Sequence, residues 1–258
     1  MKIWHMNGAG TDFVVLDARG LTLDFPSLAK NLCARTGADG FMALDNAEDA
    51  DFRLHFYNSD GSRGEMCGNG SRCICRFAYD NGIAGEKMTI QTDAGLVYGQ
   101  RLSQEQYQVQ LNNPGILDLE RKAAIAYVEL GCPGVPHAVL EIPGLSWDDR
   151  DALRQQAKTL RFDPAFPKGA NVNFYTWLGE ARIRILSYER GVEDYTLACG
   201  TGTASTACAL WTAGKLPGGK LIAENPGGTL TATVEGENNL VTTLLLQGPT
   251  QITDIFDT

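Results

Sequence analysis

The sequence predicts an α+β protein built from two pseudo-symmetric domains, and three observations lead to this prediction. The chain has 258 residues, which is enough to form two modest hydrophobic cores. Segments with the alternating pattern of half-buried strands are interspersed with segments that have the apolar spacing of helices. Four landmarks of the first half recur in the same order in the second half. Because this repeat is far longer than that of a solenoid, we infer a duplicated domain.

The composition favours a protein that acts on a small molecule. Hydrophobic residues make up 43% of the chain and charged residues 21%, as is typical of a packed globular protein. The net charge of -9, without any run of Lys or Arg, argues against a nucleic-acid partner, because such binding depends on cations that contact phosphates. The N-terminal segment lacks the apolar core of a signal peptide, and no segment reaches the length of a membrane span. We therefore expect a cytoplasmic protein.

The first landmark in each half is a strand followed by a polar loop. Residues 53–57 and 182–186 alternate between polar and apolar side chains, as half-buried strands do. Each loop ends in the second landmark, a Cys-Gly-x-Gly motif at residues 67–70 and 199–202. The two motifs therefore occupy equivalent places in the predicted repeat.

Helices are expected directly after both motifs. Residues 71–79 and 203–213 have the apolar spacing and length of helices, so each cysteine is predicted to lie where a loop enters a helix. Helical patterns also occur at residues 26–35 and 146–160, the second with Ser146 as its candidate N-cap. We expect one such helix on the outside of each half.

The third and fourth landmarks lie downstream of the helices. Residues 88–95 resemble residues 220–228, and both predict a strand, a turn and a second strand. Residues 111–114 are echoed by residues 246–249, where each segment ends in proline. The order of all four landmarks is the same in both halves, which is hard to attribute to chance.

The landmarks predict where the two domains divide. The boundary is expected near Asn113, at the end of the first copy of the repeat. We assign residues 1–112 with 247–258 to an N-terminal domain that contains Cys67, and residues 113–246 to a C-terminal domain that contains Cys199.

The duplicated cysteines suggest a reaction that inverts a carbon centre. Inverting a carbon that bears a hydrogen requires a base on one face and an acid on the other, with exchanged roles in the reverse direction. A free thiol has a pKa of about 8.5, so one of Cys67 and Cys199 can be a thiolate while the other remains a thiol. The chain has seven cysteines, an odd count that argues against a complete disulfide framework.

The residues after each cysteine are suited to hold a carboxylate. Unpaired N–H groups and the helix dipole favour negative charge at a helix start. The N–H groups of Gly68, Asn69, Gly200 and Thr201 can therefore bind the substrate carboxylate and stabilise the charge that moves onto it when the α-proton leaves. No lysine has the setting of a Schiff base and no phosphate cup is evident, so we expect neither pyridoxal phosphate (PLP) nor another cofactor or metal.

Longer motifs that include both cysteines resemble a known family. They comprise residues 6–13, 58–62, 67–72, 134–137, 168–174, 189–191 and 198–202. Together they resemble the diaminopimelate epimerases, which belong with the proline racemases to the two-cysteine, PLP-independent amino-acid epimerases and racemases. The resemblance covers essentially the whole chain. It implies two domains of matching fold, each a β-rich barrel-like sheet around a central helix, with the active site in the cleft between them.

The resemblance also implies an activity and an acid/base pair. The activity is an isomerase reaction that converts LL-diaminopimelate to meso-diaminopimelate, a precursor of lysine and peptidoglycan. Cys67 and Cys199 are implied as the acid/base pair, with His137 near the first thiol and Glu189 near the second as groups that tune them. The family often forms homodimers, so a homodimer is a further expectation.

Other residues are implied to bind the far end of diaminopimelate, which carries a second ammonium and a second carboxylate. Arg190 can form a forked contact with that carboxylate, and Glu189 can accept from the ammonium. Asn58 and Asn171 are implied to supply neutral hydrogen bonds. Two positions depart from the family, which often has asparagine where this chain has Thr11 and Val135. Threonine retains one hydroxyl for hydrogen bonding, whereas the valine side chain has no polar group.

Three alternative readings remain open. The same two thiols could epimerise another amino acid, such as histidine or a modified serine, although Glu189 and Arg190 together favour a substrate with a zwitterionic far end. Cys67, Cys73 and Cys75 could form a metal or redox cluster, but their spacing is poor for zinc. A non-catalytic protein could bind amino acids through the two glycine loops. Of the remaining cysteines, Cys33 and Cys208 are expected in the core with Cys73 and Cys75, and Cys132 is left unassigned.

Overall fold

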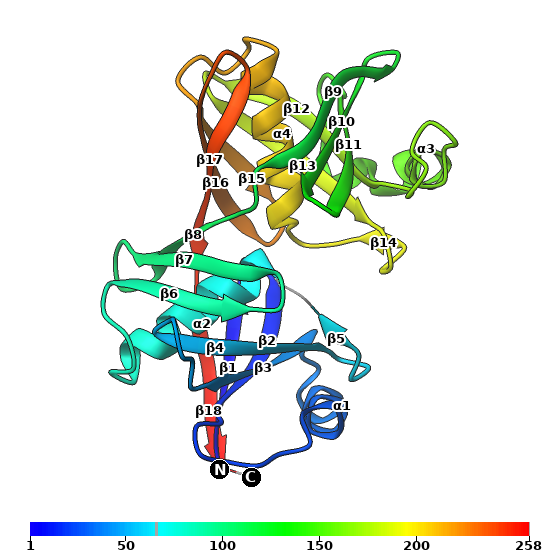
Figure 1. The fold of residues 1–258 in the computed structure, drawn as a ribbon. Coiled ribbons are helices and arrows are strands. Elements are labelled where there is room, and N and C mark those ends of the chain that lie inside the picture. Colours follow the sequence, from blue (N-terminus) through cyan, green and yellow to red (C-terminus); the bar gives the residue numbers. More distant parts are fainter. Residues whose placement is uncertain (65–66, 258) are drawn as a thin grey trace. The chain divides into compact units, whose positions relative to one another are not determined.

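The computed structural model describes residues 1–64 and 67–257, and their strands and helices form two compact units. Unit 1 consists of Met1–Gln110 and Gln247–Thr258, and unit 2 consists of Leu111–Leu246. Four α-helices and 18 strands occur among the described residues (Figure 1). The predicted α+β class is therefore confirmed. Met66, which precedes the first motif cysteine, lies outside the described residues with Glu65 and Thr258.

Unit 1 contains two helices, two parallel strand pairs and several antiparallel pairs. Its elements are β1 (Lys2–Gly8), β2 (Thr11–Asp17), α1 (Phe25–Thr36), β3 (Gly40–Asp45), β4 (Phe52–Asn58), β5 (Arg63–Gly64), α2 (Gly68–Asp80), β6 (Lys87–Thr92), β7 (Gly95–Arg101), β8 (Gln106–Gln110) and β18 (Gln251–Asp257). Helix α1 connects the parallel strands β2 and β3, and α2 connects the parallel strands β4 and β6. Antiparallel pairs join β1 to β2, β3 to β4, β6 to β7 and β7 to β8.

Unit 2 repeats this pairing scheme. Its elements are β9 (Pro114–Lys122), β10 (Ile125–Gly131), β11 (Gly134–Glu141), η1 (Trp147–Asp149), α3 (Arg150–Arg161), β12 (Asn171–Gly179), β13 (Arg182–Glu189), β14 (Asp194–Tyr195), α4 (Gly200–Thr212), β15 (Lys220–Asn225), β16 (Gly228–Glu237) and β17 (Leu240–Pro249). Helix α3 connects the parallel strands β11 and β12, and α4 connects the parallel strands β13 and β15. The boundary between the units falls within β17.

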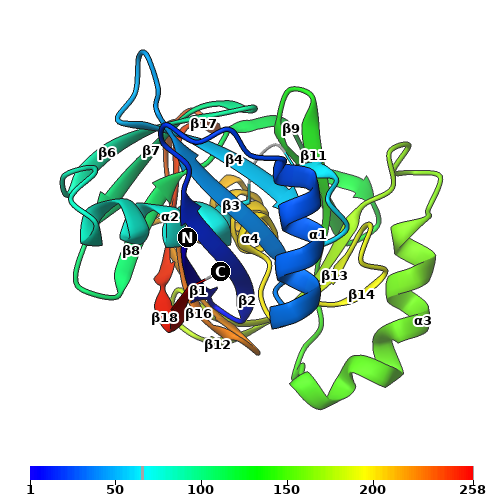
Figure 2. The same cartoon turned by 90° about the horizontal axis from the view of Figure 1, so that it is seen from below.

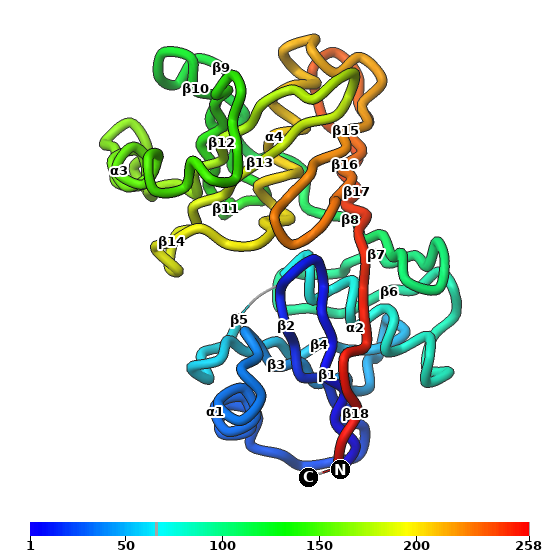
Figure 3. The backbone as a smooth tube through the Cα atoms, turned by 180° about the vertical axis from the view of Figure 1, so that it is seen from behind, coloured from blue at the N-terminus to red at the C-terminus, as the bar shows by residue number. Residues whose placement is uncertain are grey.

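The correspondence extends to the second partner of the first hairpin, which is distant in the sequence in unit 1 and is the preceding strand in unit 2. In unit 1, the last strand β18 pairs with the first strand β1, so that Lys2 lies opposite Asp257 (Figure 3). In unit 2, β9 pairs in the same antiparallel manner with β10, which is the counterpart of β1. The repeated halves inferred from the four landmarks are therefore present in the pairing of the strands.

Helices α2 and α4 form the centres of the two units. Every residue of α2 from Gly68 to Ala78 is buried, and α2 packs against β1, β2, β3, β7 and β8. Helix α4 packs in the same way against β9, β10, β11, β12, β15 and β16. A helix that is covered on all sides needs small or apolar residues around its whole circumference. Gly99 of β7 lets the strand pack closely on the helix, because a Cβ atom at this position would lie only 2.4 Å from Sγ of Cys75.

Helices α1 and α3 lie on the outside of their units, as the sequence predicted (Figure 2). Asp24 caps α1 by accepting from the N–H of Ser27, and Gly37 ends the helix in the left-handed conformation that glycine adopts readily. Ser146 caps η1 in a reciprocal capping box with Asp149, directly before α3. The predicted N-cap at Ser146 is therefore confirmed.

Each outer helix covers a hydrophobic core that it forms with strands of its own unit. In unit 1 the buried residues of this core are Ile3, Val14, Leu16, Ala18, Ala29, Leu32, Cys33, Ala38, Phe41, Ala43 and Tyr57. In unit 2 they are Ile125, Tyr127, Ala138, Leu140, Leu145, Ala157, Leu160, Phe166, Ala170, Val172, Phe174, Leu186 and Tyr188. No helix among residues 1–64 and 67–257 combines the length and hydropathy needed to cross a membrane.

Candidate active site

In unit 1, Cys67 occupies the N-cap position of α2. Its backbone is extended, with φ of -129° and ψ of 121°, and the helix begins at the next residue, Gly68. The cysteine is half-buried, whereas Gly68 and Asn69 are buried. The first motif therefore places a partly exposed thiol beside the N–H groups of a helix start, as the sequence predicted.

Thr11 and Asn69 are brought together beside this helix start. The side-chain amide of Asn69 donates to Oγ1 of Thr11 over 2.9 Å. Its carbonyl oxygen accepts from Nη2 of Arg72, also over 2.9 Å. Because the threonine oxygen accepts from Asn69, its own hydroxyl hydrogen remains available to donate elsewhere.

In unit 2, Cys199 occupies the same position at the start of α4. Its Sγ accepts from the N–H of Gly202 over 3.3 Å and lies 3.5 Å from Oγ1 of Thr201. The residue is only 5% exposed, so this thiol is more deeply buried than Cys67. Gly200 is the first residue of the helix, as Gly68 is in unit 1.

Glu189 lies beside Cys199, where β13 ends. Its Oε1 accepts from Oγ1 of Thr196 over 2.5 Å. Burial raises the pKa of Glu189, although hydrogen bonds with Thr196 and Cys199 oppose the shift. Burial, followed by the charge of Glu189, raises the pKa of Cys199 well above its ordinary value, and contacts with Thr201 and Gly202 lower it less strongly. The charge of Glu189 therefore opposes ionisation of the Cys199 thiol, whereas the hydrogen bond with Cys199 favours the ionised form of Glu189.

His137 on β11 is fully buried and is held by Asn173 of β12. Asn173 Nδ2 lies 3.1 Å from His137 Nδ1 and 3.2 Å from the carbonyl oxygen of Ala138, while its Oδ1 accepts from Ser187 over 2.8 Å. In this arrangement Nδ1 accepts, so the imidazole hydrogen is assigned to Nε2. His137 Nε2 has no hydrogen-bond partner among residues 1–64 and 67–257. Burial, and then the charge of Arg190, lower the pKa of His137 to about 3.

The His137 network reaches the start of α4 through Gly202. A Cβ atom at Gly202 would lie only 2.1 Å from Oδ1 of Asn173 and 3.1 Å from Oγ of Ser187. The glycine therefore allows the network to pack directly on the helix turn that donates to Cys199. The predicted place of His137 near Cys67 stays a prediction, since the two residues belong to different units.

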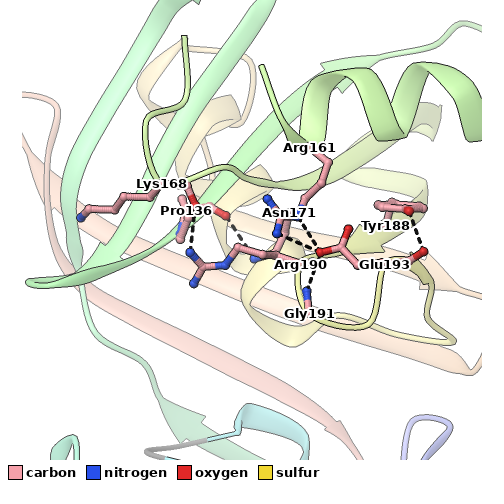
Figure 4. A network of polar contacts seen from close by, with 8 residues as sticks. All are labelled: Pro136, Arg161, Lys168, Asn171, Tyr188, Arg190, Gly191 and Glu193. Carbon is pink, nitrogen blue, oxygen red and sulfur yellow. Dashed lines mark hydrogen bonds and ion pairs between the residues drawn. The ribbon is translucent and has the colours of Figure 1, made fainter. Parts of the chain in front are cut away.

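Asn171 and Arg190 form a second polar network in unit 2 (Figure 4). Asn171 is buried, donates to the carbonyl oxygen of Pro136 over 3.1 Å and accepts from the N–H of Arg190 over 2.8 Å. The exposed guanidinium of Arg190 donates to the carbonyl oxygen of Lys168 over 3.0 Å. Asn171 therefore links β11 to the turn after β13 and fixes the backbone from which Arg190 projects.

The turn after Arg190 is held by residues that the sequence analysis did not single out. Glu193 has a φ of 56°, accepts from the N–H of Gly191 and forms an ion pair of 2.8 Å with Arg161 (Figure 4). The carbonyl oxygen of Glu193 also accepts from the hydroxyl of Tyr188 over 2.5 Å. No local pattern marks Arg161 and Glu193, because they lie far apart in the sequence.

Two predicted substrate-pocket positions lie outside these networks. The exposed Asn58 ends β4, and its amide donates to Oγ of Ser62 over 2.9 Å within the same loop. Val135 lies on β11 and its side chain is exposed, which is unusual for valine. Asn58 therefore lies where β4 ends, and its role in substrate binding stays a prediction.

The other cysteines agree with their predicted core positions. Cys33, Cys73, Cys75 and Cys208 are buried, and burial raises the pKa of Cys73 and Cys208 to about 12 each. Cys132 is exposed. Within residues 1–64 and 67–257, no group of three or more His, Cys, Asp and Glu side chains is placed to hold a metal ion.

Comparison with known proteins agrees with the resemblance seen in the motifs. Residues 3–115 and 132–252 match the family described as diaminopimelate epimerase. The diaminopimelate epimerase of Aquifex aeolicus is 37% identical over an alignment of 229 residues that covers 81% of this chain and 80% of the relative. That of Flavobacterium psychrophilum is 34% identical over 100% of this chain and 99% of the relative.

A solved structure shares the fold at much lower sequence identity. The hydroxyproline epimerase of Agrobacterium vitis, which was solved with trans-4-hydroxy-L-proline bound, superposes with a TM-score of 0.73. The superposition covers 100% of this chain and 90% of that protein, at 16% identity. This likeness confirms the fold, with its two repeated halves.

Proposed function

The chain belongs to the diaminopimelate epimerase family, a family of isomerases, and from this premise we propose that it interconverts LL- and meso-diaminopimelate. The observation that carries the proposal is the family match over both halves of the chain, each with its cysteine at the start of a buried helix. The reaction would supply a precursor of lysine and peptidoglycan.

Two thiols suffice for the proposed chemistry. One cysteine, as a thiolate, removes the α-hydrogen as a proton, and the electron pair of the broken C–H bond moves toward the α-carboxylate. The other cysteine, as a thiol, delivers its proton to the opposite face of the same carbon. The product has the inverted configuration, and the protonation states of Cys67 and Cys199 are exchanged. Atoms and charge therefore balance without an added oxidant or reductant.

The helix starts supply the groups that stabilise the transient charge. N–H groups of Gly68 and Asn69 at α2, and of Gly200 and Thr201 at α4, are candidates to donate to the α-carboxylate. Fixed backbone donors at a helix N-terminus stabilise developing negative charge without having to reorganise. Thr11, whose hydroxyl hydrogen is available, is a further candidate donor.

His137 and Glu189 are proposed to tune the thiols. The contacts of Glu189 support this role at Cys199 more directly than the binding of a distal ammonium, because the carboxylate is already engaged by Thr196 and Cys199. His137 is neutral over the physiological pH range, since burial lowers its pKa to about 3. It would therefore act as a hydrogen-bond donor through Nε2 rather than as a cation.

Arg190 and the two asparagines are proposed to bind the distal end of diaminopimelate. The exposed guanidinium of Arg190 offers several further N–H donors besides the one bound to Lys168. Asn171 holds the Arg190 backbone in place, and Asn58 contributes a neutral amide. A cytoplasmic location and a homodimer complete the proposal, and both rest on the sequence and the family.

Incubation of the purified protein in heavy water tests the proposed function. LL- and meso-diaminopimelate are supplied in separate reactions, and the isomer ratio and α-deuterium are followed by NMR. We expect both reactions to reach the same isomer mixture, with deuterium at the inverted α-carbon. Histidine and a serine derivative are supplied in parallel reactions, and labelling of one of them instead of diaminopimelate would assign another amino acid to the same machinery. Binding of diaminopimelate without any label would favour the non-catalytic binding protein.

A further inference from the structure

Arg72 of α2 is a fully buried cation that has no carboxylate partner within the described part of the chain. Its side chain is 0% exposed and is among the largest fully buried side chains of the chain. Nη1 donates to the carbonyl oxygen of Gly68 over 3.1 Å, and Nη2 donates to Oδ1 of Asn69 over 2.9 Å. Nε has no partner among residues 1–64 and 67–257, and no ion pair with Asp or Glu occurs there for Arg72. These contacts fold the guanidinium back toward the start of the helix.

A buried charge is costly unless an opposite charge lies close by. Three thiols affect the pKa of Arg72 through their charges, namely those of Cys73, Cys67 and Cys75. Burial raises the pKa of Cys73 to about 12 and raises that of Cys75 further, so both stay protonated at neutral pH. Cys67 is the partly exposed member of the three, at the helix start toward which Arg72 folds.

Other charged groups on and around α2 are compensated elsewhere. Arg76 forms an ion pair of 3.3 Å with Asp80 and donates to the carbonyl oxygen of Thr250. Tyr107 of β8 lies beside Arg101 of β7, toward the C-terminal end of the helix. Asp12 of β2 and Arg76 both act on Cys73, with opposite effects on its pKa. None of these groups compensates the charge of Arg72.

The second half of the repeat lacks such a cation. The internal repeat aligns Arg72 with Ala204, which is buried and carries no charge. The charged group that acts on the pKa of Cys199 is instead the carboxylate of Glu189. The two thiols therefore have opposite electrostatic neighbours, although their motifs and helix starts correspond.

We propose that Arg72 is the counter-ion of a Cys67 thiolate, so that in the resting protein Cys67 holds the negative charge and Cys199 stays a protonated thiol. The inference rests on the proposed two-thiol function and adds which of the two thiols is ionised in the resting protein. Arg72 acts through Cys67 and is a positioning residue. The resting protein is then ready to remove a proton with Cys67 and to deliver one with Cys199.

The pH dependence of alkylation of each cysteine tests the inference. The full chain is treated briefly with iodoacetamide between pH 5 and 10, and modification of Cys67 and Cys199 is quantified by peptide mass spectrometry. The pH midpoints are compared rather than the rates, because Cys199 is also less accessible. We expect the midpoint of Cys67 to lie below that of Cys199. Coincident midpoints, or a lower midpoint for Cys199, would overturn the inference.

Variants of two buried arginines separate the counter-ion role from a structural role. Arg72→Met should raise the midpoint of Cys67 by about one pH unit or more, since a nearby opposite charge is removed, and should leave that of Cys199 in place. Arg72→Lys should largely retain the wild-type value. Arg76→Met is the matched control on the same helix and should not move the Cys67 midpoint. An equal shift in both methionine variants would assign Arg72 to structure alone.

The remaining outcomes keep the inference separate from the proposed function. Glu189→Gln should lower the midpoint of Cys199 without changing that of Cys67. If Arg72→Met does not fold, the wild-type midpoints and Arg72→Lys still decide the question. Wild-type protein that exchanges the α-hydrogen but has coincident midpoints would contradict only the inference. Protein whose Cys67 midpoint lies below its Cys199 midpoint, but which does not exchange the α-hydrogen, would contradict the proposed function.

Discussion

At the scale of residues, Cys199 and Glu189 form a coupled acidic pair. Both pKa values are raised, chiefly because burial disfavours the charged forms, and the carboxylate further opposes the thiolate. Interacting groups of this kind release their protons as a pair rather than independently. The arrangement keeps a proton at this end of the site, which is what a group that delivers a proton to carbon requires.

His137 is expected to make stability fall at acidic pH. Its pKa is about 3 in the folded chain and about 6.5 when unfolded, so the unfolded state binds the extra proton between these values. The stabilising contribution is complete above pH 6.5 and is lost as the pH falls toward 3. Below pH 6 the loss should approach about 1.4 kcal/mol per pH unit, measured as the difference in urea-unfolding free energy between wild type and His137→Gln.

Comparison at pH 8 provides the control for this prediction. There the imidazole is neutral in both states, so any difference between wild type and His137→Gln reports packing and hydrogen bonds alone. A difference that stays constant from pH 8 to pH 5 would mean that His137 takes up a proton in the folded chain, and that the assigned neutral form is wrong.

Arg190→Ala is expected to impair diaminopimelate turnover selectively. Loss of a charged contact with the distal carboxylate should lower kcat/KM by roughly tenfold to a hundredfold, which corresponds to about 1.5–3 kcal/mol. An amino acid without that carboxylate should lose far less. Arg182→Ala is the matched control, because Arg182 lies at the other end of β13 and pairs with Glu224. Equal losses for both substrates would assign Arg190 to the structure of its turn.

At the scale of elements, the sequence predicted both central helices but placed their first residues too far along the chain. The apolar spacing predicted helices over residues 71–79 and 203–213, whereas α2 begins at Gly68 and α4 at Gly200. Glycine disfavours helix locally, so sequence patterns place such residues in a loop. Burial of the whole first turn overrides this preference, and that burial depends on strands distant in the sequence.

The close contact at Gly202 leads to a prediction about α4. Gly202→Ala places a methyl group against Asn173 and Ser187, so we expect a loss of about 1–3 kcal/mol in stability. We also expect reduced epimerisation, because the same turn donates to Cys199. Gly218→Ala is the matched control, since a Cβ atom there meets nothing within 4 Å. Urea unfolding of both variants checks the prediction, and similar losses would contradict it.

Long-range contacts also explain which site residues the sequence could not identify. Cys67, Cys199 and the glycines after them are recognisable because each motif is local and duplicated. Asn173 lies in a recognised motif, but its role appears only when β11, β12 and α4 meet. Arg72 carried one usable signal, because the internal repeat aligns this arginine with Ala204.

At the scale of the whole molecule, duplication explains both the success of the sequence analysis and its limit. Four ordered landmarks predicted two similar halves, and the same parallel and antiparallel pairs occur in both. The pairing of β1 with β18 has no local signature, because these strands lie at opposite ends of the chain. Patterns along the chain report which face of a strand is buried, but not which partner lies beside it.

The most direct test of the two-thiol account is the epimerase activity of single-cysteine variants. Cys67→Ala and Cys199→Ala should each reduce the interconversion of LL- and meso-diaminopimelate by at least about a hundredfold, as expected when an acid or base is removed. Both should unfold at urea concentrations close to that of wild type, and Cys132→Ala, which alters an exposed cysteine, should remain fully active. Wild-type activity in either Cys67→Ala or Cys199→Ala would contradict the account.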